Sequence, residues 1–174
     1  SGASAGEVVE ALLDRSMLRS VDLEDGARRF GMFVSVRAYV SEKLDAEEQA
    51  VTELRHAAFV VSEGESLGRG LSEQGAVAGW RRLAELGPDL EAALGRSRQV
   101  APTLAVRAAL ALAPIYAVRG PFGVLARLLD DELLAEVGPQ LQREARLERA
   151  HALRLGGFMD RARRELDLLL CDAK

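Results

Sequence analysis

Apolar residues recur every three to four positions along most of the chain, with polar residues between them. The pattern starts between Gly6 and Met17, resumes at Ala46 and continues to the last residues. A period of this length places apolar side chains on one face of an α-helix. The sequence therefore predicts a mainly α-helical protein.

The stretch 18–34 departs from this pattern. Leu18 to Leu23 alternates between apolar and polar residues as a strand does, and so does a return segment with Phe30, Met32 and Val34 on one face. Asp25-Gly26, between the two segments, tolerates the positive φ angles of a tight reversal. The sequence thus predicts one β-hairpin, followed by a helix whose apolar side carries Val36, Tyr39, Val40 and Leu44.

Glycine and proline divide the rest of the chain into helices. Proline favours the first turn of a helix and glycine favours its end, so we expect breaks at GESLGRG (64–70), Gly87-Pro88, Gly120-Pro121 and Gly138-Pro139. Short turns between helices predict an antiparallel array of helical hairpins. The expected helices are 46–63, one ending at Gly87, a short one opened by Pro88, 102–119 with Pro114 inside it, one from Pro121 to Leu133, 140–155 and 159–171.

The last hairpin of this array has the pattern of a tetratricopeptide repeat. Ala152, Leu155, Gly156 and Ala162 stand where such a repeat has small residues between its helices and a glycine in its turn. Gly120 lies roughly one repeat of about 34 residues earlier. Generic helical hairpins are the alternative interpretation, because two degenerate copies do not define a repeat.

The segment LLDRSMLRSVDLEDGARRFGMFVSVRAYVSEKL carries a resemblance to a known family. It looks like the winged helix that follows the nucleotide-binding core in bacterial NB-ARC-type ATPases of signal transduction, often called STAND proteins. RHAAF at 55–59 and the segment 80–94 are similar, more loosely, to the helical region that follows in these proteins. The matching positions in the first segment are Leu13, Asp14, Arg15, Ser16, Met17, Leu18, Arg28 or Arg29, Phe30, Met32, Val36, Arg37, Tyr39, Glu42 and Leu44.

The resemblance implies a fold and two interface residues. The expected fold is a partial winged helix with one β-hairpin at 1–45, followed by a tetratricopeptide-like helical region at 46–174. Arg37 and Tyr39 stand at family positions on the helix after the hairpin and are candidate interdomain or interface residues. Tyr39 is expected to bury its ring against the next helix, and Arg37 to hydrogen-bond to the hairpin.

Two departures from the family argue against nucleotide chemistry. The sequence contains no phosphate-binding loop of the form Gly-x4-Gly-Lys-Ser/Thr, so the chain is not expected to hydrolyse ATP. Many relatives carry Met-His-Asp on the return strand, where the histidine contacts bound ADP. Here the residues are Met32, Phe33 and Val34, and a phenyl ring cannot donate the hydrogen bond of an imidazole. No cofactor is therefore expected.

The charge of the chain argues against nucleic-acid binding. It has 23 basic and 27 acidic residues, a net charge of −4, so no basic field covers it. The helix that would read DNA in a winged helix carries Glu7, Glu10 and Asp14, which would repel phosphates. A DNA-binding winged-helix regulator remains the alternative hypothesis.

No set of residues has the spacing of a catalytic or metal site. His56 and His151 lack a partner at a motif spacing, and Cys171 is the single cysteine, so no catalytic and no metal-binding residue is predicted. Trp80 is expected in the core. The acidic run Asp130, Asp131 and Glu132 is expected at a solvated helix end. The arginines between Arg143 and Arg164 are expected on an exposed face, paired with nearby carboxylates.

These observations predict a non-enzymatic protein-interaction or regulatory module of a bacterial signalling or transcription-regulatory protein. Its expected partner is another protein or a neighbouring domain of a longer parent chain. No apolar run approaches the roughly 20 residues of a membrane span, and the start lacks the features of a signal peptide. The sequence therefore predicts a cytoplasmic protein that does not bind membranes.

Overall fold

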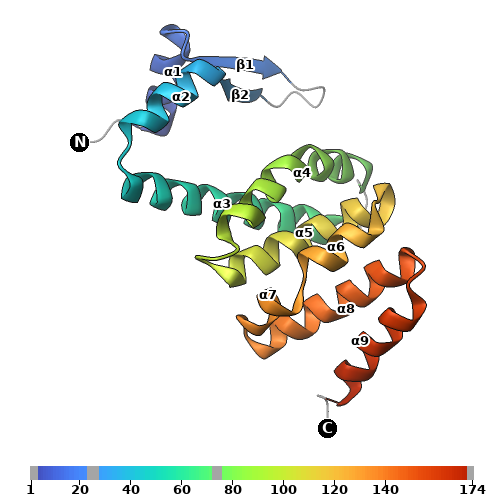
Figure 1. The fold of residues 1–174 in the computed structure, drawn as a ribbon. Helices are drawn as coiled ribbons and strands as arrows, with labels where there is room; N and C mark the ends of the chain where they lie inside the picture. The colour runs from blue at the N-terminus through green and yellow to red at the C-terminus, as the bar shows by residue number, and fades with distance from the viewer. Residues whose placement is uncertain (1–3, 23–27, 72–75, 172–174) are drawn as a thin grey trace. The chain divides into compact units, whose positions relative to one another are not determined.

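The computed structural model describes residues 4–22, 28–71 and 76–171. Its fold class is the expected one, a mainly helical chain with one antiparallel β-hairpin followed by an array of helices (Figure 1). The expected reversal at Asp25-Gly26 lies outside the described residues. Within the described ranges, no helix combines the length and apolarity that crossing a membrane would require.

The chain divides into two compact units, residues 1–50 and 51–174. The division falls inside the long helix α3 (Ala46–Gly70), whereas the sequence pattern placed it at 45/46.

Unit 1 is the helix–hairpin–helix segment, made of α1 (Ala5–Asp14), β1 (Leu18–Asp22), β2 (Arg28–Met32) and α2 (Val34–Lys43). Ser4 and Glu7 cap α1 reciprocally, since each side chain bonds to the other's backbone N–H. The strands pair with Leu18 opposite Met32 and Ser20 opposite Phe30, as the alternation predicts. Val34 was expected on the strand face. Instead it is the first residue of α2 and is 86% exposed.

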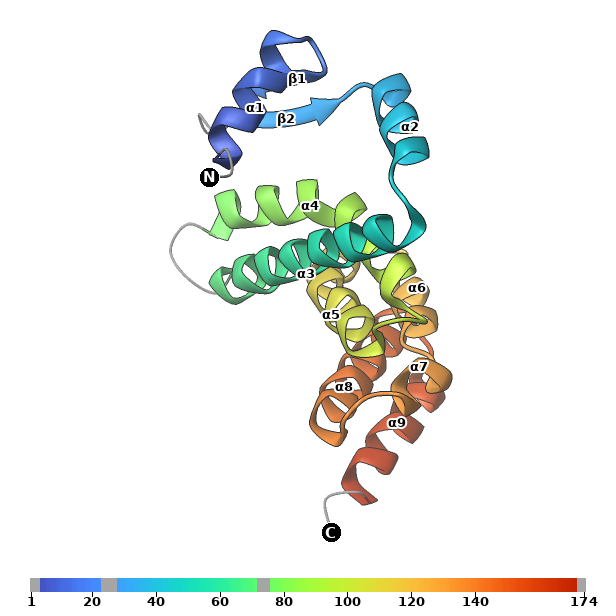
Figure 2. The same ribbon diagram turned by 90° about the vertical axis from the view of Figure 1, so that its left-hand side faces the viewer.

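Unit 2 is a stack of helices that follow one another in chain order (Figures 1 and 2). After α3 come α4 (Ala76–Ser97), α5 (Pro102–Arg119), α6 (Phe122–Leu128), α7 (Asp131–Ala135), α8 (Pro139–Leu155) and α9 (Met159–Cys171). Helix α5 contacts α4, α6, α7 and α8, and α9 packs on α8. The stack therefore has α5 at its centre and the α8–α9 hairpin at its end.

The core of unit 2 is built largely from alanine. Helix α5 alone buries Ala105, Ala108, Ala109, Ala111 and Ala113, together with Val106 and Leu112. Small side chains allow helix axes to approach closely, and a helix that is apolar on every side requires neighbours around it. Composition thus explains why α5 lies inside the stack.

The glycine-rich segment GESLGRG does not end a helix, contrary to the sequence prediction. It forms the last turns of α3, which runs unbroken to Gly70. A Cβ atom on Gly64 would lie 3.0 Å from Leu90 Cδ2 and 3.1 Å from the Ala111 Cβ. Gly64 is therefore required because α4 and α5 approach α3 closely at this point, not because the chain turns.

Pro88 does not start a new helix either. Helix α4 continues through Gly87 and Pro88 to Ser97. Buried leucines lie on both sides of the proline: Leu83 before it, and Leu90 and Leu94 after it. One apolar face therefore continues past the point where the proline breaks the helical hydrogen bonding. Packing of that continuous face offsets the backbone donor that proline lacks.

The predicted helix from Pro121 to Leu133 is two helices, α6 and α7. Asp130 separates them because its side chain accepts a hydrogen bond of 2.9 Å from the Leu133 N–H and caps α7. Trp80, expected in the core, is only partly buried, whereas Leu83 on the next turn of α4 is fully buried.

The two glycines of α3 give a matched test of this packing. We expect Gly64→Val to lower the free energy of unfolding by about 1–3 kcal/mol, because the added atoms overlap Leu90 and Ala111. Gly68→Val, where nothing lies within 4 Å of an added Cβ, should change it by less than about 0.5 kcal/mol. Urea unfolding of both variants measures the difference, and equal effects would contradict the close approach.

Candidate protein-interaction surface

The two interface residues predicted from the sequence both lie on the surface of α2. Arg37 is exposed and forms no side-chain hydrogen bond within the described residues, so the expected bond to the hairpin is not seen. Tyr39 is 62% exposed, which makes the expected burial of its ring wrong. The Lys43 ammonium lies 5.4 Å from the centre of this ring. Both residues are thus accessible to a partner.

Unit 1 exposes several other large apolar side chains near the end of the hairpin. Phe30 and Phe33 are each 44% exposed, and Val34 is almost fully exposed. The guanidinium of Arg19 lies 5.9 Å from the centre of the Phe33 ring. Exposed aromatic and aliphatic side chains of this kind are typical of contact surfaces between proteins or domains.

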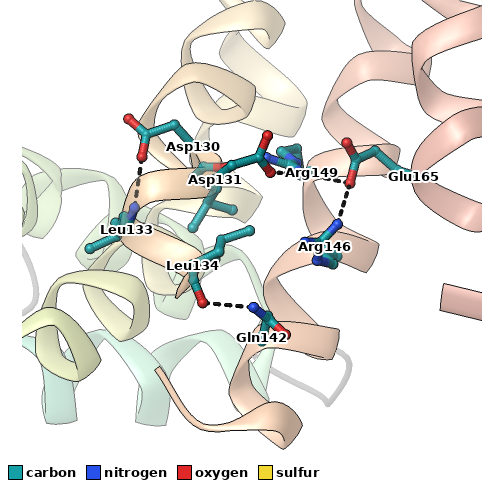
Figure 3. A network of polar contacts seen from close by, with 9 residues as sticks. Asp130, Asp131, Leu133, Leu134, Gln142, Arg146, Arg149 and Glu165 are labelled. Carbon is teal, nitrogen blue, oxygen red and sulfur yellow. Dashed lines mark hydrogen bonds and ion pairs between the residues drawn. The ribbon is translucent and has the colours of Figure 1, made fainter. Parts of the chain in front are cut away.

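A polar network centred on Arg149 holds the end of unit 2 together (Figure 3). Arg149 is 5% exposed. Its guanidinium donates to Asp131 of α7 at 2.8 Å, to Glu165 of α9 at 2.6 Å and to the Leu129 carbonyl at 3.0 Å. Arg146 Nη1 also lies 3.6 Å from Glu165. One side chain on α8 therefore joins the α6–α7 connection to α9.

This network corrects one prediction about charged residues and refines another. Arg149 is buried, so the C-terminal arginines do not all lie on an exposed face. The acidic run does lie at an exposed helix end, the first turn of α7, but it also makes specific contacts: Asp130 caps α7 and pairs with Arg98, and Asp131 pairs with Arg149. Burial alone would lower the pKa of Arg149, but its hydrogen bonds to Glu165 and Asp131 raise that pKa, so the side chain stays charged.

A second ion pair joins α3 to α5. Arg107 donates two hydrogen bonds to the Glu65 carboxylate, at 2.6 and 2.7 Å. These bonds hold the pKa of Glu65 below its usual value. Glu65 is the neighbour of Gly64, where α3 packs closely on α5, so the Glu65–Arg107 pair fixes the position of the two helices along each other.

Tyr116 of α5 makes the polar contact to α4. Its hydroxyl donates a hydrogen bond of 2.8 Å to Glu91. Burial and this neighbouring carboxylate raise the pKa of Tyr116 to about 12, because both disfavour the phenolate.

The outer side of the α8–α9 hairpin carries an open groove. Its volume is about 370 Å³, and it is lined by Leu147, Glu148, Ala150, His151 and Arg154 of α8 and by Ala162 and Leu166 of α9. Leu147 is 57% exposed and Leu166 42% exposed. Sequence reasoning placed His151, Arg154 and Ala162 in other roles and did not predict a groove. Their signal is a second helical stripe, beside the one that forms the core.

The two histidines of the chain do not lie in a cluster of metal ligands within the described residues. His56 is exposed, and His151 Nδ1 lies 3.4 Å from the Glu148 carboxylate, on the same turn of α8. Within residues 4–22, 28–71 and 76–171, no group of three histidine, cysteine or acidic residues is close enough to hold a metal ion.

Comparison with known proteins gives no further assignment. No family model matches the chain, and neither the curated proteins nor the solved structures include a match.

Removal of the Arg149 guanidinium should weaken the whole end of unit 2. We expect Arg149→Met to lower the free energy of unfolding by about 3 kcal/mol, because it leaves Asp131 and the partly buried Glu165 with fewer partners. The exposed Arg161 of α9 is the matched control, and Arg161→Met should cost less than about 0.5 kcal/mol. Urea unfolding compares the two. An equal, small loss from both would show that the network does not hold the helices.

The raised pKa of Tyr116 makes the fold sensitive to alkali. Its contribution to stability is complete below pH 10, the ordinary tyrosine value, and is lost as pH rises toward about 12. Tyr116→Phe should therefore reduce the fall in unfolding free energy over this range. Tyr39→Phe, at the exposed tyrosine, is the control. Denaturant unfolding at several alkaline pH values tests this, and an unchanged profile for Tyr116→Phe would contradict it.

Proposed function

We propose that this chain is a non-enzymatic interaction module of a cytoplasmic bacterial signalling or transcription-regulatory protein. It binds a protein partner, or a neighbouring domain of a longer parent chain, through its helical surfaces. The exposed apolar side chains of unit 1 are the observation that carries this proposal. The order of elements agrees with it, because a helix–hairpin–helix segment precedes a helical array, as in the STAND proteins that the sequence resembles.

The composition of the surface supports a protein partner over DNA. In a DNA-reading winged helix, α1 would face phosphates, yet its side chains include three carboxylates and no basic residue in the last turn. Phe30, Phe33 and Tyr39 supply the aromatic area that is enriched where proteins contact one another. Stacked helical pairs, such as those of unit 2, commonly present extended binding surfaces.

Binding to random duplex DNA separates this proposal from a DNA-binding regulator. We expect no mobility shift of the duplex at low salt, where even nonspecific binding is strongest. A shift that disappears as salt is added would support the DNA-binding alternative and overturn the proposal.

Photo-crosslinking at Tyr39 tests the interaction surface directly. A benzoylphenylalanine at this exposed position, in the natural protein within its own cells, should form an adduct with another protein or with another domain of the same chain. Mass spectrometry identifies the attached peptide. Leu168, which is 50% exposed on α9, is the control for random collision. Adducts with nucleic acid alone, or the same adducts from both positions, would contradict the proposal.

A further inference from the structure

The α8–α9 groove is open, whereas the space between α5, α6 and α8 is filled by side chains of the protein itself. Helix α8 packs against both α5 and α6. Side chains of these three helices, including Ala113, Leu125 and Ala152, meet there and leave about 0 Å³ open to water. The α8–α9 pair presents a similar concave surface on its outer side, but that one keeps about 370 Å³ open. In this fold, such a groove is thus closed when a third helix packs against the two helices that form it.

The floor of the groove suits an apolar helix face. Ala150 and Ala162 are 3% and 6% exposed and form its base, because their small side chains leave space above them. Leu147 and Leu166 stand on either side, and Met159 and Leu170 continue the stripe along α9 at 62% and 67% exposed. A helix with apolar residues at successive turns could contact all of this area.

The charges at the groove specify the partner further. Arg154, in the last turn of α8, lines the groove. Arg163 lies beside the groove lining, on α9 in the same stripe as Met159 and Leu166. Both arginines are exposed, and neither forms an ion pair within the described residues, whereas Arg146 and Arg149 below them do. The Glu148 carboxylate in the groove lies beside His151. One unpaired cation in the groove and a second beside it fit carboxylates on the incoming helix.

A second copy of the chain fits these charges less well. A copy turned over on the groove would bring the start of its α8 to the two arginines. That segment carries Arg143 next to Glu144, so its charge is balanced and would not neutralise Arg154 and Arg163. An acidic partner helix satisfies both cations.

We propose that the α8–α9 groove docks an amphipathic helix of a partner protein, with the apolar face of that helix over Leu147 and Leu166 and its carboxylates at Arg154 and Arg163. The inference rests on the proposed function, since it assigns a site and a partner chemistry to the interaction module. The cation-bearing end lies beside the Gly156-Gly157 turn, so the acidic end of the partner helix points toward that turn.

Two designed probe helices test the docking site with the full chain. Both are about 20 residues long, because isolated helices below about 12–15 residues are marginal in water. They share one leucine stripe, but one carries glutamates at one end and the other lysines. Fluorescence anisotropy should show that the glutamate probe binds about tenfold tighter than the lysine probe or better, and that added salt reduces the difference. Equal binding of the two probes would overturn the proposal.

Matched variants locate the site. Leu166→Asp should weaken the glutamate probe about 30-fold, the loss typical of a central contact, whereas Leu168→Asp, at a residue 50% exposed on the far side of α9, should not. The double variant Arg154→Glu with Arg163→Glu should reverse the preference toward the lysine probe, and Arg161→Glu should leave it unchanged. Circular dichroism shows whether Leu166→Asp folds. If it does not, the double arginine variant tests the proposal in its place. No reversal would overturn the proposal.

Sedimentation of the same proteins tests self-association. In the absence of a probe, we expect the Leu166→Asp variant and the unchanged chain to sediment with the same mass. A dimer that Leu166→Asp dissociates and Leu168→Asp does not would mean that a second copy covers the groove, which overturns the acidic-helix proposal. The Tyr39 crosslink is independent of this groove, so its success would leave the interaction function standing if the probes fail, and its failure would not alter the probe result.

Discussion

The architecture of unit 2 depends on how closely other helices can approach α5. Four neighbours, α4, α6, α7 and α8, contact it, and Gly64 brings α3 against Ala111 on the same helix. Alanine at its buried positions makes this possible, because each small side chain leaves room for a neighbouring backbone. This arrangement removes most of the apolar area of α5 from water. It also means that enlargement of a single side chain there displaces more than one neighbour.

The end of the stack is held differently, because its helices are rich in charge. Arg149 is buried at the point where the α6–α7 connection, α8 and α9 meet, and its hydrogen bonds replace part of the apolar packing. Such a buried charge is costly unless it is paired, so its bonds to Asp131 and Glu165 favour one arrangement of α9 on α8. With α9 fixed on one side and α5 and α6 on another, the remaining face of α8 stays open as the groove.

The sequence predicted the elements better than their connections. Helices α5, α8 and α9 follow from apolar spacing and from proline and glycine at their ends, because those signals are local. The predictions at Gly64 and Pro88 were wrong. The local preference of glycine and proline favours the end of a helix, whereas packing with Leu90 favours its continuation. The burial of Arg149 could not be predicted, because its partners Asp131 and Glu165 lie 18 and 16 residues away along the chain. The groove was missed because its stripe is adjacent to the core stripe and resembles an extension of it.

Unit 1 presents the opposite physical situation from α5. None of its described residues is buried, although it has the apolar side chains to form a core. A two-stranded hairpin with two short helices covers too little apolar area to be stable alone in water. Its strand pairing and the capping box of α1 order the backbone locally, but they leave Phe30, Phe33 and Val34 in contact with solvent. Burial of those side chains against a further surface would supply the missing stabilisation. A surface that binds unit 1 in its folded form would therefore raise its stability.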